Sequence, residues 1–143
     1  MTPMPRPLTS LTELEVALAH SFTRPILIFK HSSTCGVSAM ASAEIAELLA
    51  GGPLRADVYL VHLQVHRRVS NAIAEILRVR HESPLVLLVH QGSVSWHASH
   101  FRVTGRAIRE ALGRLPSRHS ATDDRSARPT GRAAVGADQI FDS

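Results

Sequence analysis

The chain contains few cysteine, lysine and aromatic residues. Its 143 residues include a single cysteine, Cys35, and 4% aromatic side chains. One cysteine excludes an internal disulfide, and with it a fold that depends on disulfide bonds. The basic residues are arginines except for Lys30, and the formal net charge is only +4. A nucleic-acid-binding surface is typically more basic and richer in aromatics, so we expect no nucleic-acid partner.

Long hydrophobic runs are also missing. No stretch approaches the roughly 18 apolar residues of a membrane span, and the N-terminal sequence "MTPMPRPLTS" lacks the apolar core of a secretory signal. An apolar content of 44% is that of an ordinary soluble protein. We therefore expect a cytoplasmic protein without a membrane partner, in a compartment where thiols stay reduced.

Four segments have the apolar spacing and end signals of helices. Ser10 and Glu13 have capping-box spacing, and leucines on one face follow them. Gly51 and Pro53 stop the second helical segment, and Thr104 can cap the last one. The predicted helices span residues 11–20, 36–50, 67–77 and 105–114.

Four apolar segments rich in β-formers alternate with these helices. They are residues 26–29, 57–63, 84–90 and 93–99, and Gln91-Gly92 between the last two predicts a hairpin turn. Helical crossovers favour parallel pairing of the first three strands, whereas the hairpin must be antiparallel. This order predicts a mixed four-stranded sheet with helices on both faces, which is the thioredoxin-like α/β fold.

The ends of the chain differ in composition from this folded part. Residues 116–143 are small and polar with proline and glycine, and they show no apolar periodicity. Such a segment cannot offset the entropy cost of ordering. The predicted organisation is a flexible N-terminus over 1–8, one domain over 9–115 and a disordered tail over 116–143.

Cys35 directly precedes the predicted helix 36–50. The unpaired N–H groups and the positive dipole end of a helix start favour a thiolate over a thiol. Lys30 and His31 end the preceding strand and are expected to add positive potential. The alternative is that Cys35 is a small buried apolar residue without chemistry.

Hydroxyl residues surround Cys35. Thr34 and Ser38 offer donors, and Ser38 occupies the position at which a dithiol redox protein has its second cysteine. Attack by Cys35 on a mixed disulfide would therefore leave an adduct on Cys35. A thiol from outside the chain must then remove it.

Four separated motifs, "FKHSSTCGVS", "VSNAIAE", "HESP" and "WHASH", occur in this order. With them the chain resembles the monothiol bacilliredoxin family over about residues 9–115. The resemblance implies a thioredoxin-like oxidoreductase that removes bacillithiol from S-bacillithiolated cytosolic proteins. Cys35 would be the attacking thiolate, bacillithiol the thiol co-substrate, and a separate thiol system the reductant. No tightly bound cofactor is implied.

The resemblance also assigns residues around Cys35. Pro84 would match the cis-proline that faces the active-site cysteine, and Ser83 would offer its backbone to the substrate. Ser99 and His100, in the loop after the last strand, are expected to contact the small thiol. Gly36 departs from the family, which usually has proline there, and Leu85 departs from the usual glutamine, so substrate contacts and thiolate tuning can differ.

Two other functions fit parts of the sequence. Cys-Gly-x-Ser is also similar to monothiol glutaredoxins, which carry an iron–sulfur cluster, but residues 98–102 read "ASHFR" in place of their glycine-rich thiol-binding loop. A non-enzymatic binding module with an inert thiol is the second alternative. The nine histidines do not form a recognisable ligand set with the single cysteine, so no metal site is predicted.

Overall fold

The computed structural model describes residues 4–32 and 36–116. Cys35 and Thr34, together with the predicted tail from residue 117 onward, therefore lie outside the described residues. The elements in chain order are β1 (Arg6–Pro7), α1 (Leu11–His20), β2 (Ile26–His31), α2 (Gly36–Ala50), β3 (Asp57–His62), α3 (Arg67–Leu77), β4 (Leu85–His90), β5 (Ser93–Ser99), the 3₁₀ helix η1 (His100–Arg102) and α4 (Gly105–Arg114).

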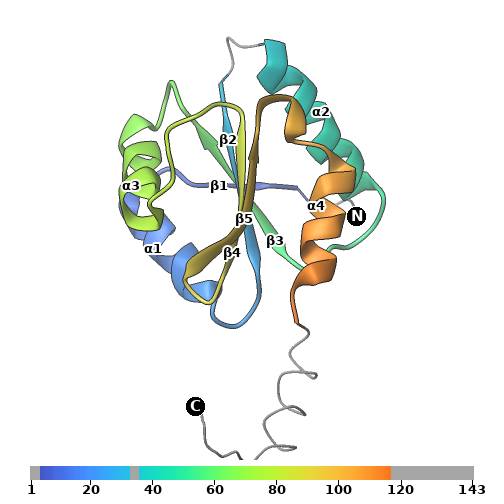
Figure 1. Cartoon of the computed structure of the whole chain (residues 1–143). Helices are drawn as coiled ribbons and strands as arrows, with labels where there is room; N and C mark the ends of the chain where they lie inside the picture. The colour runs from blue at the N-terminus through green and yellow to red at the C-terminus, as the bar shows by residue number, and fades with distance from the viewer. Residues whose placement is uncertain (1–3, 33–35, 117–143) are drawn as a thin grey trace, which may run out of the picture. The chain divides into compact units, whose positions relative to one another are not determined.

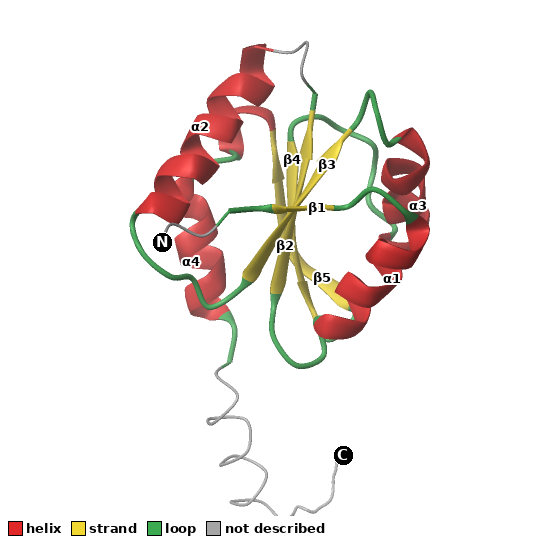
Figure 2. Cartoon of the chain, turned by 180° about the vertical axis from the view of Figure 1, so that it is seen from behind, coloured by secondary structure: helices red, strands yellow, loops and turns green. Residues whose placement is uncertain are grey.

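The sheet has five strands in the order β1-β3-β2-β4-β5, so the predicted count of four was wrong. The added strand is Arg6–Pro7, which pairs in parallel with Tyr59 and Leu60 of β3 (Figure 2). A strand of two residues has no apolar alternation, and it falls in the segment predicted to be flexible. Pairing with β3 orders it, and the following Leu8 is buried.

Helices cover both faces of the sheet, as predicted. Figure 1 shows α1 and α3 on one side and α2 and α4 on the other. Because strand side chains alternate between the two faces, β2 and β4 must be apolar on both. The core cluster under α1 and α3 includes Leu14, Ile28, Ile73 and Leu87.

The pairing of β4 differs from the prediction. β2 and β3 are parallel, as expected, but β2 and β4 are antiparallel, with Lys30 opposite Leu85. The chain turns at Arg78, whose φ is 56°, and residues 78–84 run back to the edge at which β3 ends. Seven extended residues span about 23 Å, more than the roughly 16 Å length of α3, so this segment is long enough to return.

The predicted caps and hairpin turn are present. The Glu13 amide donates to Ser10 Oγ at 3.1 Å, and the Ala107 amide donates to Thr104 Oγ1 at 3.1 Å. Gln91 and Gly92 both have positive φ, as a tight hairpin turn requires. The Glu13 carboxylate accepts from the Thr9 amide at 2.6 Å and from the Thr9 hydroxyl at 2.7 Å.

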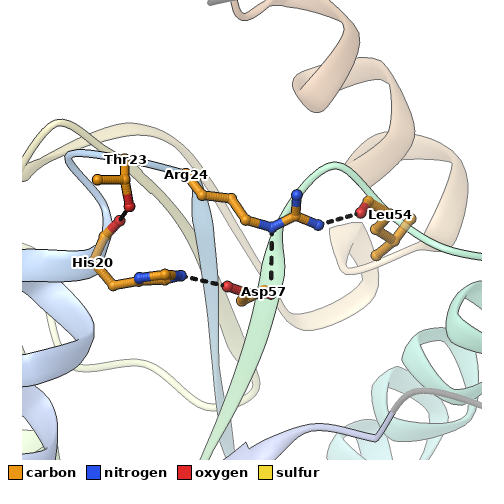
Figure 3. Close-up of polar contacts among 5 residues, drawn as sticks. All are labelled: His20, Thr23, Arg24, Leu54 and Asp57. Carbon is orange, nitrogen blue, oxygen red and sulfur yellow. Dashed lines mark hydrogen bonds and ion pairs between the residues drawn. The ribbon is translucent and has the colours of Figure 1, made fainter.

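An ion-pair cluster joins the elements at the starting edge of β2 and β3. Asp57 Oδ2 lies 2.7 Å from His20 Nε2, and Asp57 Oδ1 lies 3.3 Å from Arg24 Nε (Figure 3). Arg24 also donates to the Leu54 carbonyl at 2.6 Å, and Thr23 Oγ1 donates to the His20 carbonyl at 2.9 Å. Asp57 thereby connects the end of α1 with the start of β3.

We expect Asp57→Asn to lower the free energy of unfolding by about 1 kcal/mol, because the partly exposed side chains of His20 and Arg24 lose the carboxylate that they contact. Urea unfolding followed by circular dichroism measures this change. Glu47→Gln is the matched control, since Glu47 is an exposed carboxylate on α2 without an ion pair among the described residues, and its effect should stay within about 0.3 kcal/mol. Equal effects of the two substitutions would contradict a stabilising role for the Asp57 cluster.

Candidate functional site

The end of β2, the start of α2 and the start of β4 meet at one edge of the sheet (Figure 1). The parallel and antiparallel pairings of β2 create this arrangement. Of the predicted site residues, the structure describes all except Cys35 and Thr34. We define the candidate site as the described residues from Lys30 to Ser38, Glu82 to Pro84, and Ser99 with His100.

Ser38 links two parts of the candidate site. It is fully buried in the first turn of α2, and its Oγ accepts a hydrogen bond from the Ser32 amide at 3.2 Å. The same oxygen lies 3.4 Å from Ser83 Oγ, next to Pro84. Either hydroxyl can be the donor in this second contact. Ser38 therefore joins the end of β2 to the loop that precedes β4.

The Ser83–Pro84 peptide bond is cis, and Pro84 is buried at the start of β4. The Pro84 carbonyl accepts a hydrogen bond from the His100 amide at 2.9 Å. The predicted residues Ser83, Pro84 and His100 are thus brought together.

Glu82, which belongs to the motif "HESP", was not among the predicted site residues but lies within the candidate site. Its Oε1 accepts from Ser99 Oγ at 3.0 Å and lies 3.5 Å from His100 Nδ1. His100 has a φ of 55°, a left-handed conformation that non-glycine residues rarely adopt. Glu82 thereby connects the loop before β4 with the residues after β5. Its position two residues before the proline was the only sequence signal.

Gln64 is a second residue without a sequence signal. Its Nε2 donates to Ser32 Oγ at 2.6 Å, so the loop after β3 contacts the end of β2. Nothing in a single polar loop residue indicates such a contact, because it depends on the parallel register that ends β2 and β3 side by side.

Lys30 points to the other side of the sheet. It shares its face with Ile26 and Ile28, is 0% exposed, and donates from Nζ to the Ser70 carbonyl of α3 at 3.0 Å. Burial lowers the pKa of Lys30 to about 8. Its ammonium thus lies on the α3 side, while α2 covers the opposite face.

His31 lies on the α2 side, where its ring is 5.7 Å from that of Phe29 and 5.3 Å from that of His62. Burial, with a smaller contribution from His62, lowers the pKa of His31. Its Nδ1 is buried and has no hydrogen-bond partner among the described residues. The expected positive charge at His31 is therefore not favoured at neutral pH, where the imidazole is neutral.

Within residues 4–32 and 36–116, no group of three or more histidine, cysteine, aspartate or glutamate residues is arranged to hold a metal ion. In the same residues, no helix is both long and apolar enough to cross a membrane.

Residues 6–108 match the family model described as monothiol bacilliredoxin BrxC. The chain belongs to the monothiol bacilliredoxin family. The match covers most of the chain, including all the motifs that carried the resemblance.

Solved structures show the fold. A proposed oxidoreductase with a thioredoxin fold is 26% identical, with a TM-score of 0.66 over 75% of this chain and 92% of that one. Thioredoxin O2 from Arabidopsis thaliana is 21% identical (TM-score 0.62, 80% and 96% covered), and Fasciola hepatica thioredoxin is 16% identical (TM-score 0.62, 76% and 97% covered). The last two show the thioredoxin fold alone. Family and fold together support a thiol oxidoreductase.

Gly36 stands where the family usually has proline. An added Cβ at Gly36 would meet no described atom within 4 Å, and its φ is not in the left-handed range. Gly36→Ala should therefore raise the free energy of unfolding by about 0.5–1 kcal/mol, because it restricts the unfolded chain. Gly52→Ala is the matched control: it has equal space but a φ of +125°, and should destabilise. Urea midpoints that move in the same direction for both variants would contradict this prediction.

Lys30 should make stability depend on pH. Because its folded-state pKa is about 8 against an ordinary 10.5, the unfolded chain binds more protons between these values. The free energy of unfolding should therefore rise between about pH 8 and 10.5, by roughly 3 kcal/mol at most. Urea unfolding across this range should show that the rise is absent in Lys30→Met. The same pH dependence in both proteins would rule out Lys30 as its source.

Proposed function

We propose that the chain is a monothiol thiol–disulfide oxidoreductase of the cytoplasm, which removes bacillithiol from S-bacillithiolated proteins through Cys35. The observation that carries this proposal is the start of α2 at Gly36, directly after Cys35 in the sequence. The helix has 15 residues and no acidic side chain in its first turn. Its positive end is therefore not neutralised there, which favours a thiolate at its N-terminus.

The reaction begins with attack of the Cys35 thiolate on the bacillithiol sulfur of the mixed disulfide. A new disulfide forms between Cys35 and bacillithiol while the substrate disulfide breaks. The substrate sulfur leaves with the electron pair and takes up a proton from solvent. This exchange needs no outside oxidant, because one disulfide replaces another.

The second half of the cycle requires an external thiol. Ser38 supplies a buried hydroxyl where a second thiol would stand, and Cys35 is the single cysteine of the chain. A small thiol or thiol protein must attack the Cys35–bacillithiol disulfide. That reductant supplies the two electrons and leaves as a disulfide, and Cys35 returns to the thiolate form.

The other candidate-site residues are assigned to binding. Ser83 precedes the cis-proline and offers its backbone to an extended substrate segment. Ser99 and His100 are assigned to the small thiol, held in place by Glu82 and by the His100–Pro84 hydrogen bond. Ser83, Ser99 and His100 each contact a neighbouring residue of the site. They are therefore held in position before substrate binds.

Cys35→Ser should abolish release of the reduced substrate, because a serine hydroxyl cannot exchange with a disulfide at neutral pH. Intact mass spectrometry after incubation with a bacillithiolated protein should show an adduct of bacillithiol mass on the wild-type chain and none on the variant. Circular dichroism should show the same fold for both.

A glutathionylated form of the same substrate protein is the parallel test. An adduct formed only from glutathione would keep the chemistry and reject bacillithiol as the co-substrate. If neither modified protein yields an adduct, Cys35 is inert and the chain is a binding module.

A further inference from the structure

A cavity of about 330 Å³ lies where α3 begins. It is lined by Leu63, Gln64, Arg67, Ser70, Asn71 and His81. Two of these residues connect the cavity with the candidate site. Gln64 donates to Ser32, which precedes Cys35 by three positions, and His81 precedes Ser83 by two. The cavity therefore borders the edge of the sheet at which the candidate site lies.

The surroundings of the cavity carry positive charge. Arg67 is in the lining, and none of the six lining residues is acidic. The Lys30 ammonium lies behind the cavity wall, one hydrogen bond of 3.0 Å from Ser70. An anion in the cavity would be attracted by both of these groups.

The start of α3 lacks the groups that neutralise the starts of α1 and α4. Ser10 and Glu13 serve α1, and Thr104 caps α4, whose Gly105 amide also donates to Glu44 at 2.8 Å. The N-cap of α3 is His66, which makes no side-chain capping bond, and the first turn contains two arginines and no acid. Amides and a helix dipole that lack a protein partner favour a bound anion.

A buried hydroxyl group in the lining also lacks a partner in the described part of the chain. Ser70 is only 1% exposed, lines the cavity, and its Oγ has no hydrogen-bond partner among the described residues. Burial of a polar group without a partner costs free energy, and a ligand with an acceptor oxygen would supply the partner.

We propose that this cavity binds a carboxylate of the small thiol that the substrate carries in its mixed disulfide. Arg67 is the principal contact, because its planar guanidinium matches a carboxylate in two parallel hydrogen bonds. Asn71 and the amides of the first turn of α3 supply further donors, and Lys30 adds charge from behind. This assignment rests on the proposed function. If it holds, the cavity determines the preference of the protein for a small thiol that carries a carboxylate over a neutral one.

The test compares one model protein that carries either bacillithiol or 2-mercaptoethanol on the same cysteine. The rate constant for release of the reduced protein is measured for the wild type, for Arg67→Gln and for Arg68→Gln. The last variant is the matched control, because it removes an adjacent arginine of the same helix turn that does not line the cavity.

Arg67→Gln should slow release from the bacillithiol adduct about tenfold, as loss of a charged hydrogen bond predicts. Release from the 2-mercaptoethanol adduct, which has no carboxylate, should change less than about twofold, and Arg68→Gln should leave both rates within the same limit. The proposal would be overturned if Arg67→Gln slowed release from both adducts equally, or slowed neither. It would also be overturned if Arg68→Gln slowed release from the bacillithiol adduct alone.

A wild-type chain that releases neither adduct would reject the proposed function, and the cavity is then judged separately. Free malate is added to the labelled chain while the amide signals of Ser70 and Asn71 are followed by NMR. Saturating shifts that are lost in Arg67→Gln would support a carboxylate site, and their absence would overturn it.

Discussion

The antiparallel pairing of β2 with β4 is the constraint on which the candidate site depends. It brings Lys30 opposite Leu85, so the strand that leads to Cys35 in the sequence ends beside the strand that begins after Pro84. Parallel pairing would instead have put the start of β4 at the opposite edge of the sheet, next to the Asp57 cluster. The Ser38–Ser83 contact would then be impossible. The return segment over residues 78–84 is therefore as important to the site as the residues that compose it.

Most of the elements could be predicted because each is encoded locally. Residues 11–20, 36–50, 67–77, 93–99 and 105–114 begin and end as expected, since capping residues, glycines and apolar spacing mark them. The other three strands begin or end one or two residues from the predicted positions, and the main errors were the missed strand β1 and the direction of β4. β1 consists of two residues without a pattern, and the direction of β4 depends on the length and path of a loop, which apolar periodicity does not encode.

The candidate site was predictable in part for the same reason. Ser83, Pro84 and His100 belong to recognisable motifs, and the structure brings them together. Gln64 could not be found, because its contact joins segments that are distant in sequence. Glu82 lies in the motif "HESP", but its contacts with Ser99 and His100 could not be predicted for the same reason. Lys30, by contrast, was predicted to act on the thiol because it lies five residues before Cys35. Strand alternation instead turns its side chain toward α3. The roles of Cys35 and Thr34 stay predictions.

The buried Ser38 hydroxyl has a consequence for timing. On the proposed chemistry, a chain with a thiol at this position would clear its own adduct as fast as the two sulfurs meet. With Ser38 held between Ser32 and Ser83, the adduct persists until a reductant molecule arrives from solution. On this chemistry, the fraction of chains that carry the Cys35–bacillithiol disulfide depends on two rates. One is the rate at which bacillithiolated proteins react with Cys35, and the other is the rate at which the reductant removes the adduct.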